Sequence, residues 1–398
     1  INIVLHLQHY YIKIFPKEVF LMGNEEIQET EVWMPKKNPW IISIPLMISM
    51  FMFVLDETIS NVALPYMAGT FSVSHNESTW ILTFYLIASG LIIPCVDFLC
   101  KKFGRNNFFM FSIVLFTVAS LLCGCSRSLM EIIFARFLQG LGGGAILPLA
   151  QSIMLESFPK KDRGKAMGMF GFAVVIGPIL GPVIGGWITE NWSWPFIYLI
   201  NLPFGIFAFL ASKMLLEDSP YGRKIDGIKL DTFGVIFLVF WIVTLQVVLD
   251  KGNDADWFGS TWVCWLTAIS VVSCVLFFIS QFKNHKNALI DLEAMKDRNF
   301  FFGTVIQVVL MAVLMASSAI LPSMSQSLMG YTSFLSGLSM MPRGAGCMTG
   351  VILSTILAGK VSERAQVMFG LFTIGIGGLL FGELNTQIAL VNIAIPNY

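Results

Sequence analysis

Long apolar runs separated by short polar segments dominate this chain. Each run has about the 20 residues that a helix needs to cross the hydrocarbon core of a bilayer. The runs are rich in Leu, Ile, Phe, Gly and Ala and lack a ten-residue alternating pattern, which favours helices over the strands of a barrel. The pattern predicts about eleven spans, near residues 40–63, 79–98, 107–125, 131–153, 166–189, 196–215, 232–250, 261–282, 301–323, 334–357 and 367–384.

Composition agrees with this interpretation. Of 398 residues, 56% are hydrophobic and only 13% are charged, whereas about 25% are charged in soluble domains. Much of the surface must therefore face the lipid bilayer, and we predict an all-α polytopic membrane protein. The net charge of zero gives no argument for a nucleic-acid partner.

Several function classes have no support in the sequence. The seven cysteines lack metal-ligand spacing, and no Gly-x4-Gly-Lys-Ser/Thr loop for ATP is present. We find no pairing of a nucleophile with a base, so a membrane enzyme is the least favoured class. The sequence leads us to expect neither a metal nor another cofactor.

The distribution of positive charge predicts the orientation, because Lys and Arg are retained on the cytoplasmic side. With the N-terminus in the cytoplasm, only Arg127 and Lys251 fall in external segments, and Arg136 and Arg343 lie within spans. The other 21 of the 25 Lys and Arg residues are then cytoplasmic (25 − 4 = 21).

An internal repeat predicts the domain organisation. Residues 64–67 at the end of the first span resemble 321–324 at the end of the ninth, and residues 100–105 resemble 359–364 at nearly the same offset. Spans 9–11 would then repeat spans 1–3 of a six-plus-two-plus-six arrangement, with about 11 of an expected 14 helices present. Residue 1 is Ile and a conventional leader begins at Met22, so one interpretation of residues 1–21 is upstream translation. The predicted regions are a cytoplasmic leader (1–38), an N-terminal six-helix bundle (39–216), two inserted helices with their loops (217–300), and the first three helices of a truncated C-terminal bundle (301–398).

Two adjacent acids, Asp56 and Glu57, lie in the first span. An Asp at the centre of a membrane helix costs about 2.5–3.5 kcal/mol, so such groups normally face a polar cavity or a partner. Successive residues diverge by about 100° around a helix, which places Asp56 with Ser60 and Glu57 with Asn61. A carboxyl group in a low-dielectric site can exchange protons near neutral pH. Asp56 is the favoured proton-coupling residue and Glu57 the second candidate, while Asn61 is a candidate cavity or substrate residue. The alternative is that both acids stay hydrated in an outer vestibule.

The fourth span carries Arg136, Gln139 and Gly140 on one stripe. Arginine keeps its proton and therefore needs a counter-charge or carbonyl groups within the membrane. An acid of the first span is the natural candidate, and protonation of that acid would weaken the pair. We also expect Gln139 to line the cavity. In the alternative, Arg136 extends to the membrane interface.

The fifth span contains glycines at i, i+4 and i+8, which form a small-residue face for close helix contact. Two prolines in the same segment are expected to bend the helix. Such a helix suits either a gate between two conformations or static packing. The residues concerned are Gly177, Pro178, Gly181, Pro182, Gly185 and Gly186.

Between about Pro39 and Phe381, these motifs together resemble the major facilitator superfamily, and within it the fourteen-span drug:proton antiporter branch. The string from Asp56 to Pro65 is similar to the first-helix signature of that branch, and the fourth-span and fifth-span motifs are similar to motifs of the superfamily. The loop after the second span differs from the superfamily pattern at Asp97. It keeps the residues to which the resemblance assigns a gating role, namely Lys101, Lys102, Gly104 and Arg105.

The resemblance implies a major facilitator fold and a proton-coupled antiporter that exports hydrophobic drugs across the inner membrane by alternating access. Its implied partners are protons, a hydrophobic small molecule, a periplasmic adaptor and an outer-membrane channel. Two alternatives remain open at this point: export of a natural metabolite such as a siderophore or fatty acid, and a non-transporting relic from a fragmentary or frameshifted reading frame.

Overall fold

The computed structural model describes residues 33–382, except 160, 226, 229, 284–287, 291 and 358–360. Most of the predicted leader (1–38) and the end of the last predicted region (301–398) lie outside the described residues. Within the described part the secondary structure consists of helices, turns and bends, with no strand. The predicted all-α architecture is confirmed.

The longer helices follow one another with short connections. They are α2 (Pro39–Phe71), α4 (Trp80–Ile92), α5 (Val96–Phe103), α6 (Arg105–Cys125), α7 (Leu129–Ser157), α8 (Arg163–Asn191), α10 (Asn201–Leu215), α11 (Thr232–Lys251), α12 (Thr261–Lys283), α13 (Arg298–Ser327), α14 (Ser333–Leu357) and α15 (Glu363–Gly382). Short helices are α3 (His75–Ser78), α9 (Phe196–Leu199), η2 (Ile93–Cys95), η3 (Pro220–Gly222), η4 (Trp257–Gly259) and η5 (Leu292–Lys296).

Ten helical segments in the described part are long and apolar enough to cross a membrane. The remaining predicted span, 334–357, does form helix α14, but this helix carries Arg343 and several serines and is not among the ten. Some helices continue past their apolar stretch: α2 runs to Phe71, whereas the pattern placed its end near residue 63. Hydropathy marks only the lipid-facing part of a helix. The helix itself ends at Phe71 and is capped by Ser72, whose N–H donates to carbonyl oxygens of the last turn.

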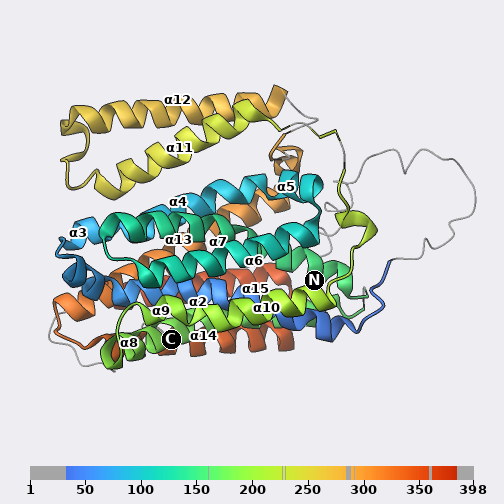
Figure 1. The fold of residues 1–398 in the computed structure, drawn as a ribbon, viewed down its shortest axis with the longest axis horizontal. Coiled ribbons are helices and arrows are strands. Elements are labelled where there is room, and N and C mark those ends of the chain that lie inside the picture. Colours follow the sequence, from blue (N-terminus) through green and yellow to red (C-terminus); the bar gives the residue numbers. More distant parts are fainter. Residues whose placement is uncertain are drawn as a thin grey trace, which may run out of the picture.

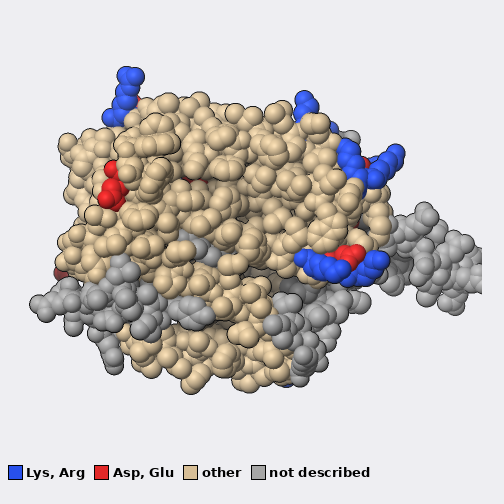
Figure 2. All heavy atoms as spheres, turned by 90° about the horizontal axis from the view of Figure 1, so that it is seen from below, with Lys and Arg blue, Asp and Glu red and all other residues tan. Residues whose placement is uncertain are grey.

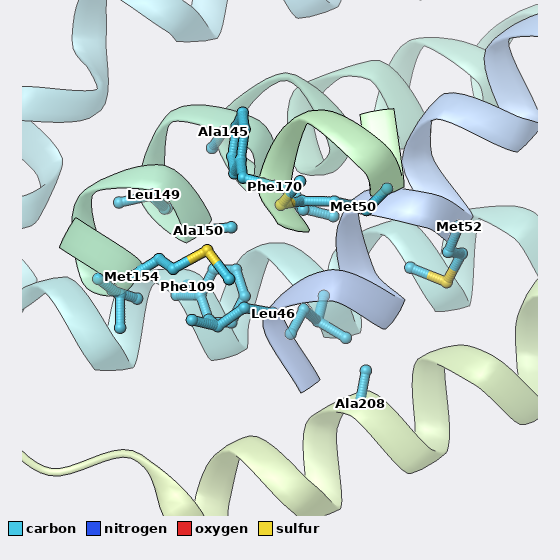
Figure 3. Packing of buried hydrophobic residues seen from close by; sticks show 14 of the residues in the cluster. Leu46, Met50, Met52, Phe109, Ala145, Leu149, Ala150, Met154, Phe170 and Ala208 are labelled. Atoms are coloured by element: carbon cyan, nitrogen blue, oxygen red, sulfur yellow. The ribbon is translucent and has the colours of Figure 1, made fainter. Parts of the chain in front are cut away.

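Helix α2 lies inside the N-terminal bundle, where it packs against α7, α8 and α10 (Figure 1). Its first half contributes Leu46 and Met50 to a buried apolar cluster with Phe109 of α6 and with Leu149 and Met154 of α7 (Figure 3). This packing fixes the depth and rotation of α2, and so the position of the polar residues in its second half.

Helices α11 and α12 form a hairpin that projects beside this bundle, with α12 at the outer edge (Figure 1). Helix α11 packs on α4, where Ile242 lies closest to Gly90. At the end of the hairpin, Lys251 Nζ donates a hydrogen bond to the carbonyl oxygen of Asn76, at 2.5 Å. Helix α14 packs mainly on α8, and α13 touches α2 near the end of that helix.

The surface supports a membrane location. On the face drawn in Figure 2, the charged side chains lie toward the ends of the long axis and the middle is uncharged. Because the described helices run along this axis, their uncharged middle parts match the hydrocarbon core of a bilayer.

Candidate functional site

A buried polar cluster surrounds Asp56 at the centre of the N-terminal bundle. Arg136 Nη1 of α7 donates to Asp56 Oδ2 at 2.6 Å. The other carboxylate oxygen, Oδ1, accepts from Gln139 Nε2 at 2.8 Å and from Asn201 Nδ2 at 2.7 Å. Asp56, Arg136, Gln139 and Asn201 all have 0% exposure. The acid of the first span that pairs with Arg136 is therefore Asp56. Ser120 of α6 accepts a hydrogen bond from Gln139, so residues of α2, α6, α7 and α10 together form the cluster.

Arg136 is held on all sides within this cluster. A second bond from Nη1 reaches Gln139 Oε1 at 2.7 Å, and Nε points to the carbonyl oxygen of Ile81 at 3.5 Å. The guanidinium carbon lies 4.0 Å from the ring centroid of Tyr85 and 5.4 Å from that of Tyr198. Carboxylate, amide and aromatic faces together replace the water that this cation loses on burial.

Gln139 is part of this cluster, although the sequence led us to expect it at the cavity wall. It is fully buried and donates to both Asp56 and Ser120 Oγ. Sequence reasoning missed Asn201 and Ser120. The only available signal was an uncharged polar side chain within an apolar span. Burial of such a group costs little free energy when it is hydrogen-bonded, so many spans contain one and the signal does not identify a site.

Protonation of Asp56 would change the charge balance of this cluster. When Asp56 is ionised, it takes three hydrogen bonds and neutralises Arg136. Protonation would remove the counter-charge of Arg136 and turn one acceptor oxygen into a donor. An unpaired buried cation is costly. Protonation of Asp56 would therefore favour a different arrangement of these side chains.

Glu57, the neighbouring acid, has a different environment. It is half-buried and accepts no hydrogen bond from any described residue. Asn61, one turn further along the same face, is also half-buried and also makes no side-chain hydrogen bond within the described part of the chain. The structure thus separates the two adjacent acids: Asp56 accepts three hydrogen bonds, and Glu57 accepts none from the described residues.

The glycine face of α8 packs directly on α2. A Cβ at Gly177 would lie 2.7 Å from Val54 Cγ1, and one at Gly185 would lie 2.5 Å from Ile59 Cγ1. Between them, Thr58 occupies the space opposite Gly181, and its hydroxyl points to the carbonyl oxygen of Gly177 at 3.4 Å. Helix α8 is continuous through Pro178 and Pro182.

A second side of α8 contacts α14. Gly186 lies against the backbone of Ser333 and Phe334, and Gly337 lies against the backbone of Pro182. Glu190 Oε2 accepts from the N–H of Phe334 at 3.2 Å. Helix α8 is thus the main link between α2 and the C-terminal helices.

The glycines of α7 allow an equally close approach to α4. A Cβ at Gly140 would lie 2.8 Å from Ala88 Cβ and 3.2 Å from the backbone N of Ser89. Ser89 Oγ donates to the carbonyl oxygen of Gly140 at 3.3 Å. This contact sets the distance between Arg136 and the ring of Tyr85.

The loop residues expected to form a gate lie together at the junction of α5 and α6. Gly104 separates the two helices with φ of +85°, a conformation that favours glycine. Arg105 is 7% exposed and forms an ion pair with Glu156 of α7; its Nη2 also donates to Ser219 Oγ at 3.0 Å. This side chain therefore connects α6, α7 and the segment after α10.

The two lysines of this loop are less buried. Lys101 Nζ pairs with Asp97 Oδ2 at 2.5 Å, and the carbonyl oxygen of Lys101 accepts from the N–H of Ile225 at 2.7 Å. The ammonium group of Lys102 lies 5.7 Å and 5.4 Å from the ring centroids of Phe98 and Phe103. Asp97, where the sequence departs from the superfamily pattern, thus has a local partner. Within the described residues, no group of three or more His, Cys, Asp and Glu side chains could hold a metal ion.

Comparisons with known proteins agree on one family. The model of the Major Facilitator Superfamily matches residues 46–395. The probable multidrug resistance protein EmrY of Escherichia coli K12 is 37% identical over 309 residues, 77% of this chain and 59% of that protein. The multidrug export protein EmrB of the same strain is 35% identical, covering 83% and 64%, and the fatty acid resistance protein FarB of Neisseria gonorrhoeae is 35% identical, covering 76% and 59%. The chain spans about three fifths of the length of these curated relatives.

Solved structures share the fold at low identity. A peptide transporter POT in complex with sulfate has a TM-score of 0.64 and 12% identity, with 94% of this chain and 83% of that chain covered. A D-xylose-proton symporter has a TM-score of 0.55 and 15% identity, with 90% and 79% covered. At these identities the likeness concerns the fold alone.

Proposed function

This chain belongs to the Major Facilitator Superfamily, and from that premise we propose that it is a proton-coupled antiporter that exports hydrophobic drugs or other toxic compounds by alternating access. The names of EmrY and EmrB support the substrate class. The observation that carries the coupling mechanism is the fully buried ion pair between Asp56 and Arg136.

In this mechanism Asp56 is the proton carrier and Arg136 modulates it. With Asp56 ionised, the bonds from Arg136, Gln139 and Asn201 hold α2, α7 and α10 together. A proton on Asp56 weakens these bonds, and the relative positions of the helices change in response. Such a change shifts the population between two conformations of the protein.

The glycine contacts of α8 would carry this shift to the C-terminal helices. Gly177, Gly181 and Gly185 of α8 pack on α2, and Gly186 of α8 packs on α14. A movement of α2 would therefore displace α14 through α8. Small residues let the backbones of membrane helices approach closely, so these contacts join the helices almost directly. The Arg105 ion pair with Glu156 would close the bundle where α6 begins, by joining that end of α6 to α7.

We also propose an inner-membrane location with the N-terminus in the cytoplasm, because 21 of the 25 Lys and Arg residues (25 − 4) then lie inside. Regions 39–216, 217–300 and 301–398 would be the N-terminal bundle, an inserted pair of helices and part of a C-terminal bundle. We also propose a periplasmic adaptor and an outer-membrane channel as partners, which the resemblance to the drug:proton antiporter branch implies. Export across the inner membrane alone would leave the compound in the periplasm.

A second candidate is export of fatty acids, which the similarity to FarB favours. Long apolar acids share their hydrophobic character with many drugs and would use the same route. Growth on a panel of toxic compounds, together with lipid analysis of the medium, would separate the two.

The test of proton coupling is Asp56→Asn, which keeps the shape of the side chain and removes its titration. In vesicles with an imposed pH gradient, we expect transport of Nile red, a neutral hydrophobic dye, to fall more than tenfold, while binding of the dye is retained. The control is Ser49→Ala in the same helix, since the buried Ser49 hydroxyl donates to the carbonyl oxygen of Pro45 within α2, away from the Asp56 cluster. If Asp56→Asn transports the dye normally under a pH gradient, the proton role belongs elsewhere.

A further inference from the structure

Asn201 of α10 has one buried hydrogen-bonding atom that it does not use. Its Nδ2 donates to Asp56 Oδ1 at 2.7 Å and points to Ser120 Oγ at 3.4 Å. Its carbonyl oxygen, Oδ1, is buried and accepts no hydrogen bond from the described residues. A carboxylate can only accept hydrogen bonds, so the nitrogen of the amide must face Asp56 and the oxygen must face away. Buried polar atoms are nearly always hydrogen-bonded, so this unpaired acceptor requires an explanation.

Protonation of Asp56 would create a donor in a place that holds only donors. Oδ2 of Asp56 receives the bond from Arg136, and Oδ1 receives bonds from the neutral amides of Gln139 and Asn201. A proton is repelled by the guanidinium group, so Oδ1 is the more favourable oxygen for it. Both hydrogen bonds to Oδ1 come from N–H groups, and one of the two amides must give way.

The amide of Asn201 can turn at a lower cost than that of Gln139. Gln139 uses both of its ends, because Oε1 accepts from Arg136 at 2.7 Å and Nε2 also donates to Ser120 Oγ at 2.8 Å. Apart from its bond to Asp56, Asn201 would give up only the 3.4 Å contact with Ser120. The terminal torsion of an asparagine side chain is broad and roughly two-fold, so a half-turn exchanges its oxygen and nitrogen with almost no change of shape.

We propose that Asn201 is the positioning residue for the proton on Asp56. Its amide presents Nδ2 to the ionised carboxylate and, after a half-turn, presents Oδ1 to the protonated carboxyl group. Of the three hydrogen bonds to Asp56, this one is re-formed with its direction reversed, so protonation loosens α7 from α2 more than it loosens α10. The inference rests on the proposed function, because it names a residue that positions the coupled proton.

The surroundings of Asp56 limit which groups can take part in a pH-dependent change. The charged or titratable side chains nearest to it are Arg136 of α7, Tyr85 of α4, Cys123 of α6, Tyr198 of α9 and Glu57 of α2. Helix α8 meets this part of α2 with glycines, and α10 contributes the uncharged Asn201. Arginine keeps its proton, and tyrosine and cysteine ordinarily titrate above neutral pH. Between acidic and neutral pH, the groups that need to be separated are therefore Asp56 and Glu57.

The experiment follows the side-chain carbonyl groups of asparagine by infrared spectroscopy while the pH is lowered. It uses the purified full-length protein in lipid, with a carbon-13 label at these carbonyl groups. An amide carbonyl that accepts no hydrogen bond absorbs at a higher frequency than one that does. We expect one asparagine band to move to lower frequency as the pH falls. Its midpoint should equal that of the carboxyl band of protonated Asp56, which is identified by its loss in Asp56→Asn.

Three variants assign the moving band. Asn201→Ser should lack it, and Asp56→Asn should abolish the pH dependence of the Asn201 band. The matched control is Asn191→Ser in α8, since Asn191 is an exposed asparagine whose Nδ2 donates to the carbonyl oxygen of Trp187. The control should keep the moving band with an unchanged midpoint. Glu57→Gln should also keep it, because the neighbouring acid does not bond to Asn201.

Three results would overturn the inference: a carboxyl band of Asp56 that titrates while every asparagine band stays fixed, a moving band that persists in Asn201→Ser, or a shift that disappears in Glu57→Gln. A bound water on Oδ1 would give the first of these, because the carbonyl would then be hydrogen-bonded at every pH. The wild-type protein and Asp56→Asn keep the test decisive if Asn201→Ser does not fold. Failure of proton coupling is distinguishable, because it would appear as normal pH-driven dye transport in Asp56→Asn and would leave the response of Asn201 to protonation of Asp56 intact.

Discussion

Replacement of Gly186 by alanine would test whether close contact between α8 and α14 holds the two parts of the protein together. The added Cβ would lie 2.7 Å from the carbonyl carbon of Ser333 and 2.8 Å from Cα of Phe334. Both are backbone atoms at the start of α14, so no side-chain rotation can relieve the overlap. Because carbon atoms pack at about 3.5–4.0 Å, the two helices must separate by roughly 0.7–1.3 Å.

The magnitude follows from two opposing terms. Overpacking of a tight contact costs about 1–3 kcal/mol, while alanine is favoured over glycine within a helix by about 1 kcal/mol. Gly171 provides the matched control, because it lies in the same helix and an added Cβ there has no atom within 4 Å. Both variants gain the helix term, so their difference of about 1–3 kcal/mol reports the packing term alone.

Two measurements check this. The midpoint of thermal unfolding in detergent should be lower for Gly186→Ala than for Gly171→Ala. A cysteine at Ser333, which is 1% exposed and lies at the contact with Gly186 itself, should react faster with maleimide in the Gly186→Ala protein. The background must lack the native cysteines. Equal midpoints and equal labelling rates in the two alanine variants would refute the reasoning.

Two further predictions concern the ion pair and the orientation. Asp56→Asn and Arg136→Gln should each lower the free energy of unfolding by about 3–5 kcal/mol, because each leaves a buried group unpaired. The double variant should lose clearly less than the sum of the two single losses. Additive losses in a double-mutant denaturation cycle would contradict the pairing. In intact cells, a cysteine at Lys102 should resist an impermeant maleimide and one at Asn253 should react; labelling at Lys102 from outside would reverse the orientation.

Much of the fold could be predicted because the membrane imposes one simple rule. An apolar run of about 20 residues forms a helix, since no other backbone conformation satisfies its hydrogen bonds in lipid. The rule locates helices and not their ends, so the extension of α2 to Phe71 was not predicted. The rule also included residues 334–357, which form α14 but carry Arg343 and are not among the ten candidate membrane helices of the described part. Packing of α14 on α8 gives this more polar helix a protein neighbour.

The candidate site could be predicted only where burial is expensive. A charge within a span requires a partner, which led from Arg136 to an acid of the first span. Asn201 and Ser120 were not predicted, since uncharged groups impose no such requirement and the sequence does not define which residues of two helices meet. For the same reason the fully buried position of Gln139 became evident only from the packing of α6, α7 and α10.

The arrangement around α2 explains why adjacent residues of one helix have different neighbours. Successive positions on a helix point about 100° apart, so residues 56, 57 and 58 face three different environments. Asp56 meets three donors from α7 and α10, and Thr58 meets a glycine of α8. Glu57 lies between these two contacts and meets no donor among the described residues. Because all three residues belong to one continuous helix, the loosening of the Asp56 contacts in the proposed mechanism would also displace Glu57 and the residues packed on α8.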